Sequence, residues 1–128
     1  MDIGIKGTGE LTVTPEKTAK AMTSGAAYVF ATPAMLAFME HTAFTSVLPF
    51  LEEGQATVGT GVNLKHIAST PVGMKVRCET ELVAINGRAL SFTFKVFDEK
   101  ELIGEGTHER FIIFTEKFQA KADAKLNG

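Results

Sequence analysis

The sequence predicts an α+β domain in which a five-stranded antiparallel sheet wraps around one central helix. Residues 29–48 form a long apolar stretch, and its apolar side chains cover more than the single stripe of a surface helix. Beyond residue 55, apolar and polar side chains alternate in twos, which is typical of strands with one buried face. Such a sheet needs one face covered, and only one helix is long and apolar enough to cover it.

Length and composition indicate one domain and exclude several classes of partner. At 128 residues the chain can enclose one hydrophobic core, and we expect residues 1–128 to form a single domain. A formal net charge of -2 without a basic run gives no reason to expect a nucleic-acid partner. Cys78 is the only cysteine, and no histidine cluster accompanies it, so we expect no disulfide, no metal and no cofactor.

The chain shows no targeting or membrane signal. Its first residues lack the long apolar run of a signal peptide, and no segment reaches membrane-spanning length. We therefore expect a soluble, cytoplasmic protein without a membrane partner.

Thr32 and Pro33 mark the start of the central helix. A threonine hydroxyl can cap free backbone N–H groups, and proline at the first helical position gives up no hydrogen bond. We expect the helix to run from Thr32 to about Leu48 as a core helix. Glu40 lies within it, and a glutamate is rarely buried without a partner or a task. Its role therefore needs an explanation from elsewhere in the chain.

The remaining elements are expected to be mostly strands. Gly9 to Thr14 alternates weakly and predicts a first strand, which Pro15 stops. Residues 16–27 can form a short helix around residues 18–22, followed by a small-residue loop at residues 23–27. Four strands are expected after the central helix: Ala56–Ile67, Met74–Ala84, Ala89–Phe97 and Leu102–Thr115. Residues 116–128 are mostly charged and form either a surface helix or a frayed tail.

Two features of these strands fix which side chains face the core. Asn86-Gly87 is a strong hairpin signal, because both residue types tolerate the positive φ values of a type I′ turn. In the strand over residues 56–67, alternation places one set on the apolar face: Val58, Thr60, Val62, Leu64 and His66. Gly59 falls on the opposite face of that strand.

An antiparallel sheet curled around a single central helix is the hot-dog architecture. One such sheet leaves its edge strands exposed and its pocket half open. Pairing with a second copy removes an exposed edge and completes the pocket. We therefore expect a homodimer.

Three residues can form a catalytic set. Thr32 lies about two helical turns before Glu40, and His66 points into the layer between helix and sheet. The three can converge, although in a dimer they need not come from one subunit. The Thr32 hydroxyl or a water would attack an activated acyl group, His66 would take the proton, and Glu40 would orient the imidazole or act as base or nucleophile. Oxyanion donors are available at the helix start and at the backbone of Gly59 or Gly61.

Structural roles explain each of these residues as well. Thr32 can be a helix cap only, His66 can be a satisfied core histidine, and Glu40 can pair with Lys65 or with the partner subunit. Near the chain end, His108 and Arg110 share one strand face, where Arg110 either stabilises the dimer or binds a phosphate or carboxylate.

Five stretches carry motifs of a known family: Phe30-Ala31-Thr32, Leu36-Ala37-Phe38-Met39-Glu40, Val58-Gly59-Thr60, His66-Ile67-Ala68-Ser69-Thr70-Pro71-Val72-Gly73 and Gly106-Thr107-His108-Glu109-Arg110. They resemble hot-dog thioesterases of the fluoroacetyl-CoA thioesterase-like group, from about residue 27 to residue 121. The resemblance implies a homodimer that hydrolyses acyl-CoA thioesters without a metal. It implies catalytic roles for Thr32, Glu40 and His66 and an active-site backbone role for Gly59.

The resemblance is weakest where substrate choice would be set. The fluoroacetyl-specific member carries a pair of phenylalanines just before the core helix, whereas this chain has Thr23-Ser24-Gly25-Ala26-Ala27 there. Fluoroacetyl-CoA is therefore not carried over as the substrate.

The sequence thus predicts an acyl-CoA thioesterase that converts a short-chain or small acyl-CoA to the free acid and CoA. His66 is the expected general base, Glu40 its partner or the nucleophile, and Thr32 the nucleophile or an oxyanion donor. Gly59 and Arg110 are expected to bind the substrate. The alternative is a non-catalytic acyl-CoA or small-ligand binding protein of the same fold. A third hypothesis is that Glu40 serves only the dimer interface.

Overall fold

The computed structural model describes residues 1–128 and contains one sheet and two α-helices. The five strands are β1 (Lys6–Thr12), β2 (Gln55–His66), β3 (Lys75–Asn86), β4 (Ala89–Phe97) and β5 (Leu102–Phe114). The α-helices are α1 (Thr32–Val47) and α2 (Thr115–Asp123), and the short 3-10 turns are Pro15–Lys17, Leu48–Phe50 and Ala124–Asn127.

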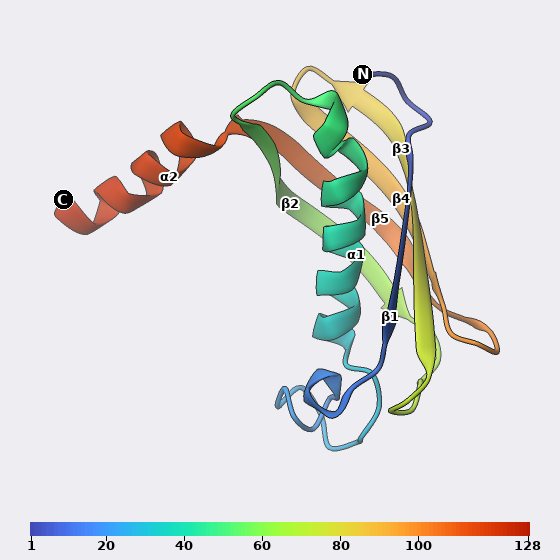
Figure 1. The fold of residues 1–128 in the computed structure, drawn as a ribbon. Coiled ribbons are helices and arrows are strands. Elements are labelled where there is room, and N and C mark those ends of the chain that lie inside the picture. The colour runs from blue at the N-terminus through green and yellow to red at the C-terminus, as the bar shows by residue number, and fades with distance from the viewer.

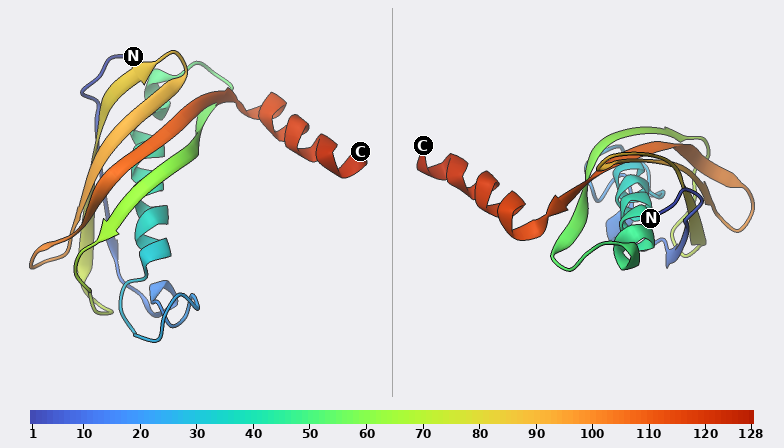
Figure 2. Two further views of the ribbon diagram at one scale, coloured as in Figure 1. Left: turned by 180° about the vertical axis from the view of Figure 1, so that it is seen from behind. Right: turned by 90° about the horizontal axis from the view of Figure 1, so that it is seen from above.

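All neighbouring strands are antiparallel, in the order β1-β3-β4-β5-β2. The sheet curls around α1, which runs along its concave face (Figures 1 and 2). The predicted hot-dog architecture is therefore confirmed. Because β1 and β2 form the two edges, β2 presents a free edge of twelve residues. From the end of β5, α2 projects away from the sheet on the side of β2 (Figure 1).

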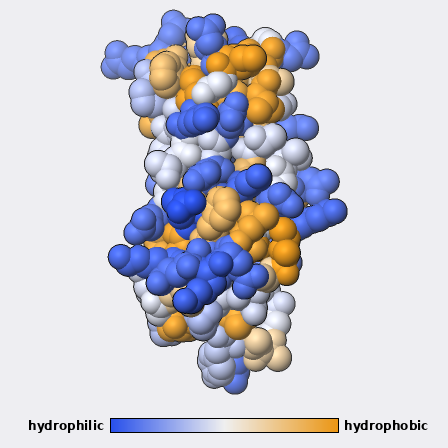
Figure 3. Space-filling view, turned by 90° about the vertical axis from the view of Figure 1, so that its right-hand side faces the viewer, coloured by the Kyte–Doolittle hydropathy of each residue, from blue (hydrophilic) through white to orange (hydrophobic).

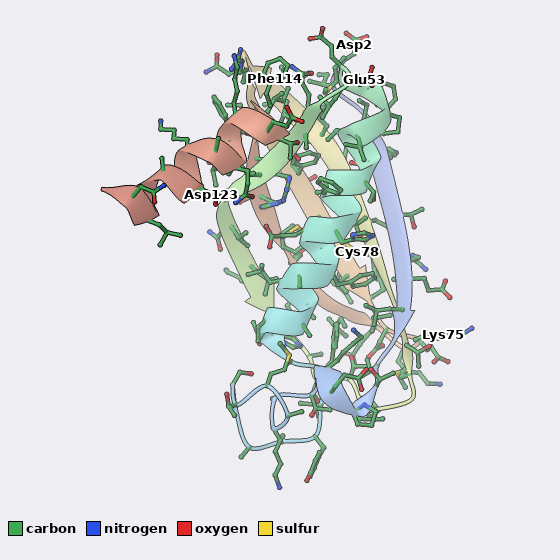
Figure 4. All side chains as sticks on the ribbon, turned by 60° about the vertical axis from the view of Figure 1, so that its left-hand side comes forward. Asp2, Glu53, Lys75, Cys78, Phe114 and Asp123 are labelled. Atoms are coloured by element: carbon green, nitrogen blue, oxygen red, sulfur yellow. The ribbon has the colours of Figure 1, made fainter.

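The core lies between α1 and the sheet. Its members come from alternate positions of β3 and β4 and from the sheet-facing side of α1, as the alternation predicts: Met35, Phe38, Met39, Ala43, Val47, Val76, Cys78, Leu82, Leu90, Phe92, Phe94 and Val96. Cys78 lies in this layer (Figure 4). The side of the molecule near β1 and β3 carries hydrophilic side chains between smaller hydrophobic areas (Figure 3).

Several predicted boundaries and turns need correction. The first strand spans Lys6–Thr12 rather than Gly9–Thr14, because its pairing with β3 continues to Glu81. The expected short helix at residues 18–22 is a series of turns, and only Pro15–Lys17 forms a 3-10 helix. The charged tail is helical from Thr115 onward, which resolves the alternatives in favour of a surface helix.

The β3–β4 hairpin uses a different turn from the predicted one. Asn86 pairs with Ala89, so the two loop residues are Gly87 and Arg88. Only Gly87 has a positive φ, of 63°. A positive φ at the first central residue alone is typical of a type II′ turn rather than type I′.

Strict alternation along β2 is also wrong, because the strand contains a bulge. Gly59 pairs with Arg110 but Gly61 pairs with Glu109, so Thr60 is the extra residue. Before the bulge, Thr57 is buried and faces α1, and Gly59 shares that face instead of the opposite one. The bulge restores the predicted inward direction for His66.

No helix of the protein is long and apolar enough to cross a membrane.

Candidate functional site

The first part of the site lies where α1 begins. The Thr32 hydroxyl oxygen is 2.8 Å from Nδ1 of His66, which ends β2. The helix starts at Thr32, as predicted, but the residue at the N-cap position is Ala31 and no side chain caps the helix. The expected capping role of Thr32 is therefore wrong, because its hydroxyl bonds to His66. The free N–H groups of this first turn stay available as donors.

His66 has a nitrogen that the protein leaves without a partner. Nε2 is buried and makes no hydrogen bond. Burial lowers the pKa of His66, and the nearby Ala68 backbone partly opposes this shift. The imidazole is therefore held neutral at neutral pH, with one nitrogen on Thr32 and the other free, as a general base requires.

A pocket of about 320 Å³ opens beside this pair. Besides Thr32 and His66, it is lined by side chains from the loop before α1 and from the segment after β2: Ala19, Ser24, Val29, Phe30, Ile67, Ala68 and Ser69. Ser24 is the member that comes from the small-residue loop at residues 23–27. The pocket thus places small and apolar groups next to a hydroxyl and an imidazole.

The second part of the site surrounds Glu40 in the middle of α1. Its Oε2 lies 3.3 Å from Nη1 of Arg110 and 4.0 Å from Nε2 of His108, both on β5. The Glu40 side chain is 37% exposed, whereas those of Arg110 and His108 are 7% and 0% exposed. Glu40 therefore pairs with Arg110, not with Lys65, and keeps one side open.

Gly59 closes this second cluster from β2. A Cβ built at Gly59 would overlap Oε2 of Glu40 and would come within 3.4 Å of both Arg110 and His108. Only glycine lets the β2 backbone approach the carboxylate so closely. The backbone of Gly59 and the carboxylate of Glu40 thus share one small region.

The chain brings some of the predicted residues together and separates others. Thr32 contacts His66, and Glu40 contacts Arg110 and lies against Gly59. Glu40 lies about 12 Å farther along the α1 axis than Thr32, at a rise of about 1.5 Å per residue. Within one chain the site is therefore two half-sites, one at the start of α1 and one at its middle.

His108 was not among the predicted site residues. The signal was present, because His108 and Arg110 share a strand face, and both prove to be buried. The sequence did not show that Arg110, seventy positions away, is the partner of Glu40, and so it did not place His108 beside Glu40.

The family model described as fluoroacetyl-CoA-specific thioesterase matches residues 13–116. The fluoroacetyl-CoA thioesterase of Streptantibioticus cattleyicolor is 36% identical over 98% of this chain and 94% of its own length. The chain belongs to this thioesterase family.

Solved structures agree with this membership. A structure of the fluoroacetyl-CoA thioesterase has a TM-score of 0.92 at 36% identity, over 98% of this chain and 97% of that one. A thioesterase superfamily member from Thermus thermophilus has a TM-score of 0.90 at 31% identity, over 98% and 93% of the two chains. A variant of the fluoroacetyl-CoA enzyme has been solved with acetyl-CoA.

Membership of a family of thioester hydrolases fits the chemistry of the first half-site. A hydroxyl bonded to a neutral imidazole at an uncapped helix start can supply a nucleophile, a base and backbone donors. The Cys78 thiol does not supply such a nucleophile, because burial raises its pKa to about 11.

Proposed function

We propose that this protein hydrolyses a short-chain acyl-CoA thioester to the free acid and CoA. The observation that carries the proposal is the 2.8 Å contact between Thr32 Oγ1 and His66 Nδ1, in the wall of a pocket that both residues line. The acetyl-CoA and the fluoroacetate bound in structures of the related enzyme are both small acyl species, which supports a small substrate.

The reaction needs a nucleophile, a base and an oxyanion site. Either the Thr32 hydroxyl or a water attacks the thioester carbonyl carbon, and His66 takes the proton of the attacking oxygen. The carbonyl oxygen becomes an oxyanion, which backbone N–H groups of the first α1 turn or of Gly59 stabilise. The C–S bond then breaks, and the CoA sulfur takes the proton from His66. If Thr32 attacks, a water repeats the sequence on the threonyl ester.

The two half-sites combine if two copies pair through β2. An antiparallel β2–β2 contact with its twofold axis near Val62 and Asn63 brings Gly59 of one protomer level with His66 of the other. Val62 is 38% exposed on this free edge. Each active site of the proposed homodimer then has Thr32 and His66 from one protomer, with Glu40, Gly59 and Arg110 from its partner.

In this arrangement Glu40 completes the chemistry begun by Thr32 and His66. Arg110 anchors one side of the Glu40 carboxylate, and the open side faces the His66 imidazole of the other protomer. There the carboxylate either orients the imidazole, attacks the thioester carbonyl as a nucleophile, or activates the water as a base. Gly59 offers its N–H where a side chain would block access, and Arg110 offers a fixed positive charge at the substrate.

The direct test is thiol release from a panel of acyl-CoA esters of increasing chain length. We expect turnover of the shortest esters by the wild type and loss of turnover in His66→Ala and Glu40→Ala. Saturable binding of acyl-CoA by calorimetry without any hydrolysis would instead favour a binding protein. Intact-mass spectra of acid-quenched reactions distinguish attack by Thr32, which adds an acyl mass, from attack by water.

A mixing experiment tests whether the site is shared between protomers. His66→Ala and Glu40→Ala are each expected to be inactive, but a mixed dimer of the two keeps one complete site. After subunit exchange, random pairing should restore about a quarter of the wild-type activity. If no activity returns although mixed dimers form, Glu40 and His66 do not act across the interface.

A further inference from the structure

His108 is buried in the second half-site but has no role in the function proposed so far. Its side chain is fully buried, and it lies on β5 two residues before Arg110, with the Phe92 ring nearby. A buried histidine is costly unless both ring nitrogens are satisfied. Here both nitrogens have partners within 3.1 Å, the carbonyl oxygen of Gly61 and Nη1 of Arg110, and Arg110 belongs to the proposed site.

The two partners fix the protonation state of the ring. Nδ1 lies 2.8 Å from the carbonyl oxygen of Gly61, which can only accept, so Nδ1 carries the proton. Nε2 lies 3.1 Å from Nη1 of Arg110, which can only donate, so Nε2 carries the lone pair. The geometry therefore requires a neutral imidazole in a single tautomer.

Arg110 is held on three sides by this arrangement. Its Nε donates to Thr57 Oγ1 at 2.7 Å, and its Nη2 donates to the Thr57 carbonyl at 2.9 Å. Nη1 is directed between His108 Nε2 and Glu40 Oε2. The neutral His108 ring accepts a hydrogen bond from Nη1 but carries no negative charge. Glu40 is therefore the group that neutralises the positive charge of Arg110.

The same histidine also reaches the backbone bulge in β2. The carbonyl that it binds belongs to Gly61, on the far side of the extra residue Thr60 from Gly59. One ring thus links the bulge that presents the Gly59 backbone to the guanidinium that anchors Glu40.

We propose that His108 is a positioning residue of the thioesterase site, a neutral acceptor that orients Arg110 and, through it, the Glu40 carboxylate. The inference rests on the proposed function, because it assigns a role within the same site. His108 does not touch the substrate. It sets the place from which Glu40 acts, so its loss should lower kcat with little effect on KM.

Protonation of His108 would break this arrangement. An imidazolium would place an N–H against the guanidinium N–H of Arg110, and both cations would then compete for Glu40. Burial is the main cause that lowers the pKa of His108, and Arg110 lowers it further, while the Gly61 carbonyl, Glu40 and Glu109 oppose these effects. The ring is therefore neutral at neutral pH and becomes charged only in acid.

Three variants separate the two hydrogen bonds of the ring. His108→Gln places an acceptor where Nε2 lies, His108→Asn keeps a donor for Gly61 but cannot reach Arg110, and His108→Phe keeps the ring alone. Leaving an Arg110 N–H unpaired should cost about tenfold or more in kcat for Asn and Phe, whereas Gln should stay within about threefold of the wild type. His41→Gln, on the exposed side of α1, is the matched control.

The pH profile provides a readout that a packing role would not move. The wild type should lose kcat/KM in acid through two histidines, His66 and His108, whereas His108→Gln should lose it through His66 alone and show a shallower decline. Long-range 1H–15N spectra of the wild type should show His108 in the Nδ1–H tautomer at neutral pH.

The outcomes distinguish this proposal from the proposed function. Absence of hydrolysis by the wild type contradicts the thioesterase proposal, whereas the ring spectra still report on His108. If the wild type is active and all three variants match it, or if Gln and Phe lose kcat equally, the positioning role is overturned. Thermal unfolding of each variant shows whether it folds. If His108→Phe does not fold, the comparison of His108→Asn with His108→Gln tests the positioning role.

Discussion

The two half-sites differ in how completely the protein satisfies them. Around Arg110, all three guanidinium nitrogens have partners, and both ring nitrogens of His108 are bonded. Around Thr32 and His66 there is a single side-chain hydrogen bond, and the remaining imidazole nitrogen has none. The first arrangement is typical of a structural support, whereas the second leaves polar groups without a protein partner, as the proposed catalytic role of Thr32 and His66 requires.

The two half-sites lie on the same helix, α1, one at its start and one at its middle. The start of α1 has no side-chain cap, and its first residue, Thr32, lines a pocket. The middle of α1 carries Glu40 against two buried β5 side chains, His108 and Arg110, which hold its carboxylate on one side. Mutations in the first half-site should therefore affect rate more than stability, and mutations in the second should affect both.

The largest effect is expected from His66→Ala. Loss of a general base typically lowers the rate by about 10² to 10⁴, and we expect kcat to fall by about 10³. Stability should change by less than about 1 kcal/mol, because the lost ring makes one hydrogen bond and contains an unsatisfied buried nitrogen. Steady-state kinetics and urea unfolding measure the two quantities. A large stability loss would place His66 among the structural residues.

Arg110→Met should produce the opposite balance. It removes the buried partner of Glu40 and leaves the Nε2 of His108 and the Thr57 oxygens unpaired, which should cost about 2 to 3 kcal/mol of unfolding free energy. The half-exposed Glu40 moderates the cost, because water can solvate it. Urea unfolding of Arg110→Met beside Arg77→Met, which alters an exposed ion pair, tests this expectation. Equal losses in both variants would contradict it.

Gly59→Ala and Gly61→Ala form a matched pair across the bulge. A Cβ at Gly59 would overlap Glu40 Oε2, whereas a Cβ at Gly61 would meet only Glu109 Oε2, at an ordinary 3.6 Å. We expect Gly59→Ala to cost about 1 to 2 kcal/mol of stability and most of the activity, and Gly61→Ala to cost less than about 0.5 kcal/mol. Similar behaviour of the two variants would show that Glu40 can move away from β2 without consequence.

The sequence predicted the elements better than it predicted the contacts between them. Apolar spacing located α1 and four strands, because burial imposes periods of 3.6 and 2. The bulge at Thr60 left no such trace, since Val58-Gly59-Thr60-Gly61 offers small or ambiguous residues on both faces. The Thr32-Pro33 motif predicted the helix start correctly and the cap wrongly, because the competing partner His66 lies on another element.

The candidate site shows the same pattern: its residues were predicted, but the contacts between them were not. Thr32, Glu40, His66, Gly59 and Arg110 were all predicted as site residues, but their grouping into two half-sites depends on distances between α1, β2 and β5. Glu40 had several possible cationic partners in the sequence, and only the register of β5 against β2 selects Arg110. The tautomer of His108 likewise follows from its two neighbours in space.

A pH effect on stability should follow from both buried histidines. The folded protein lowers the pKa values of His66 and His108, so both resist the protons that the unfolded chain accepts below about pH 6.5. Their contribution to stability is therefore complete above that pH and is lost as pH falls through the folded pKa values. Urea unfolding between pH 7.5 and pH 5 should show declining stability. His108→Gln should flatten this decline, and an unchanged slope would mean that His108 does not titrate on unfolding.

The smallest effect is expected at the pocket wall, where the loop before α1 contributes Ser24. A phenylalanine at this position adds bulk beside Thr32 and His66 without touching either half-site's hydrogen bonds. Ser24→Phe should therefore leave acetyl-CoA turnover within about threefold of the wild type and lower turnover of six-carbon and longer esters by a further factor of about ten, since pocket discrimination per methylene is modest. Thr23→Phe, at an exposed position that does not line the pocket, controls for bulk in the loop itself. Equal effects of Ser24→Phe on short and long esters would show that chain length is selected elsewhere, and the half-site at the start of α1 would then supply chemistry without selectivity.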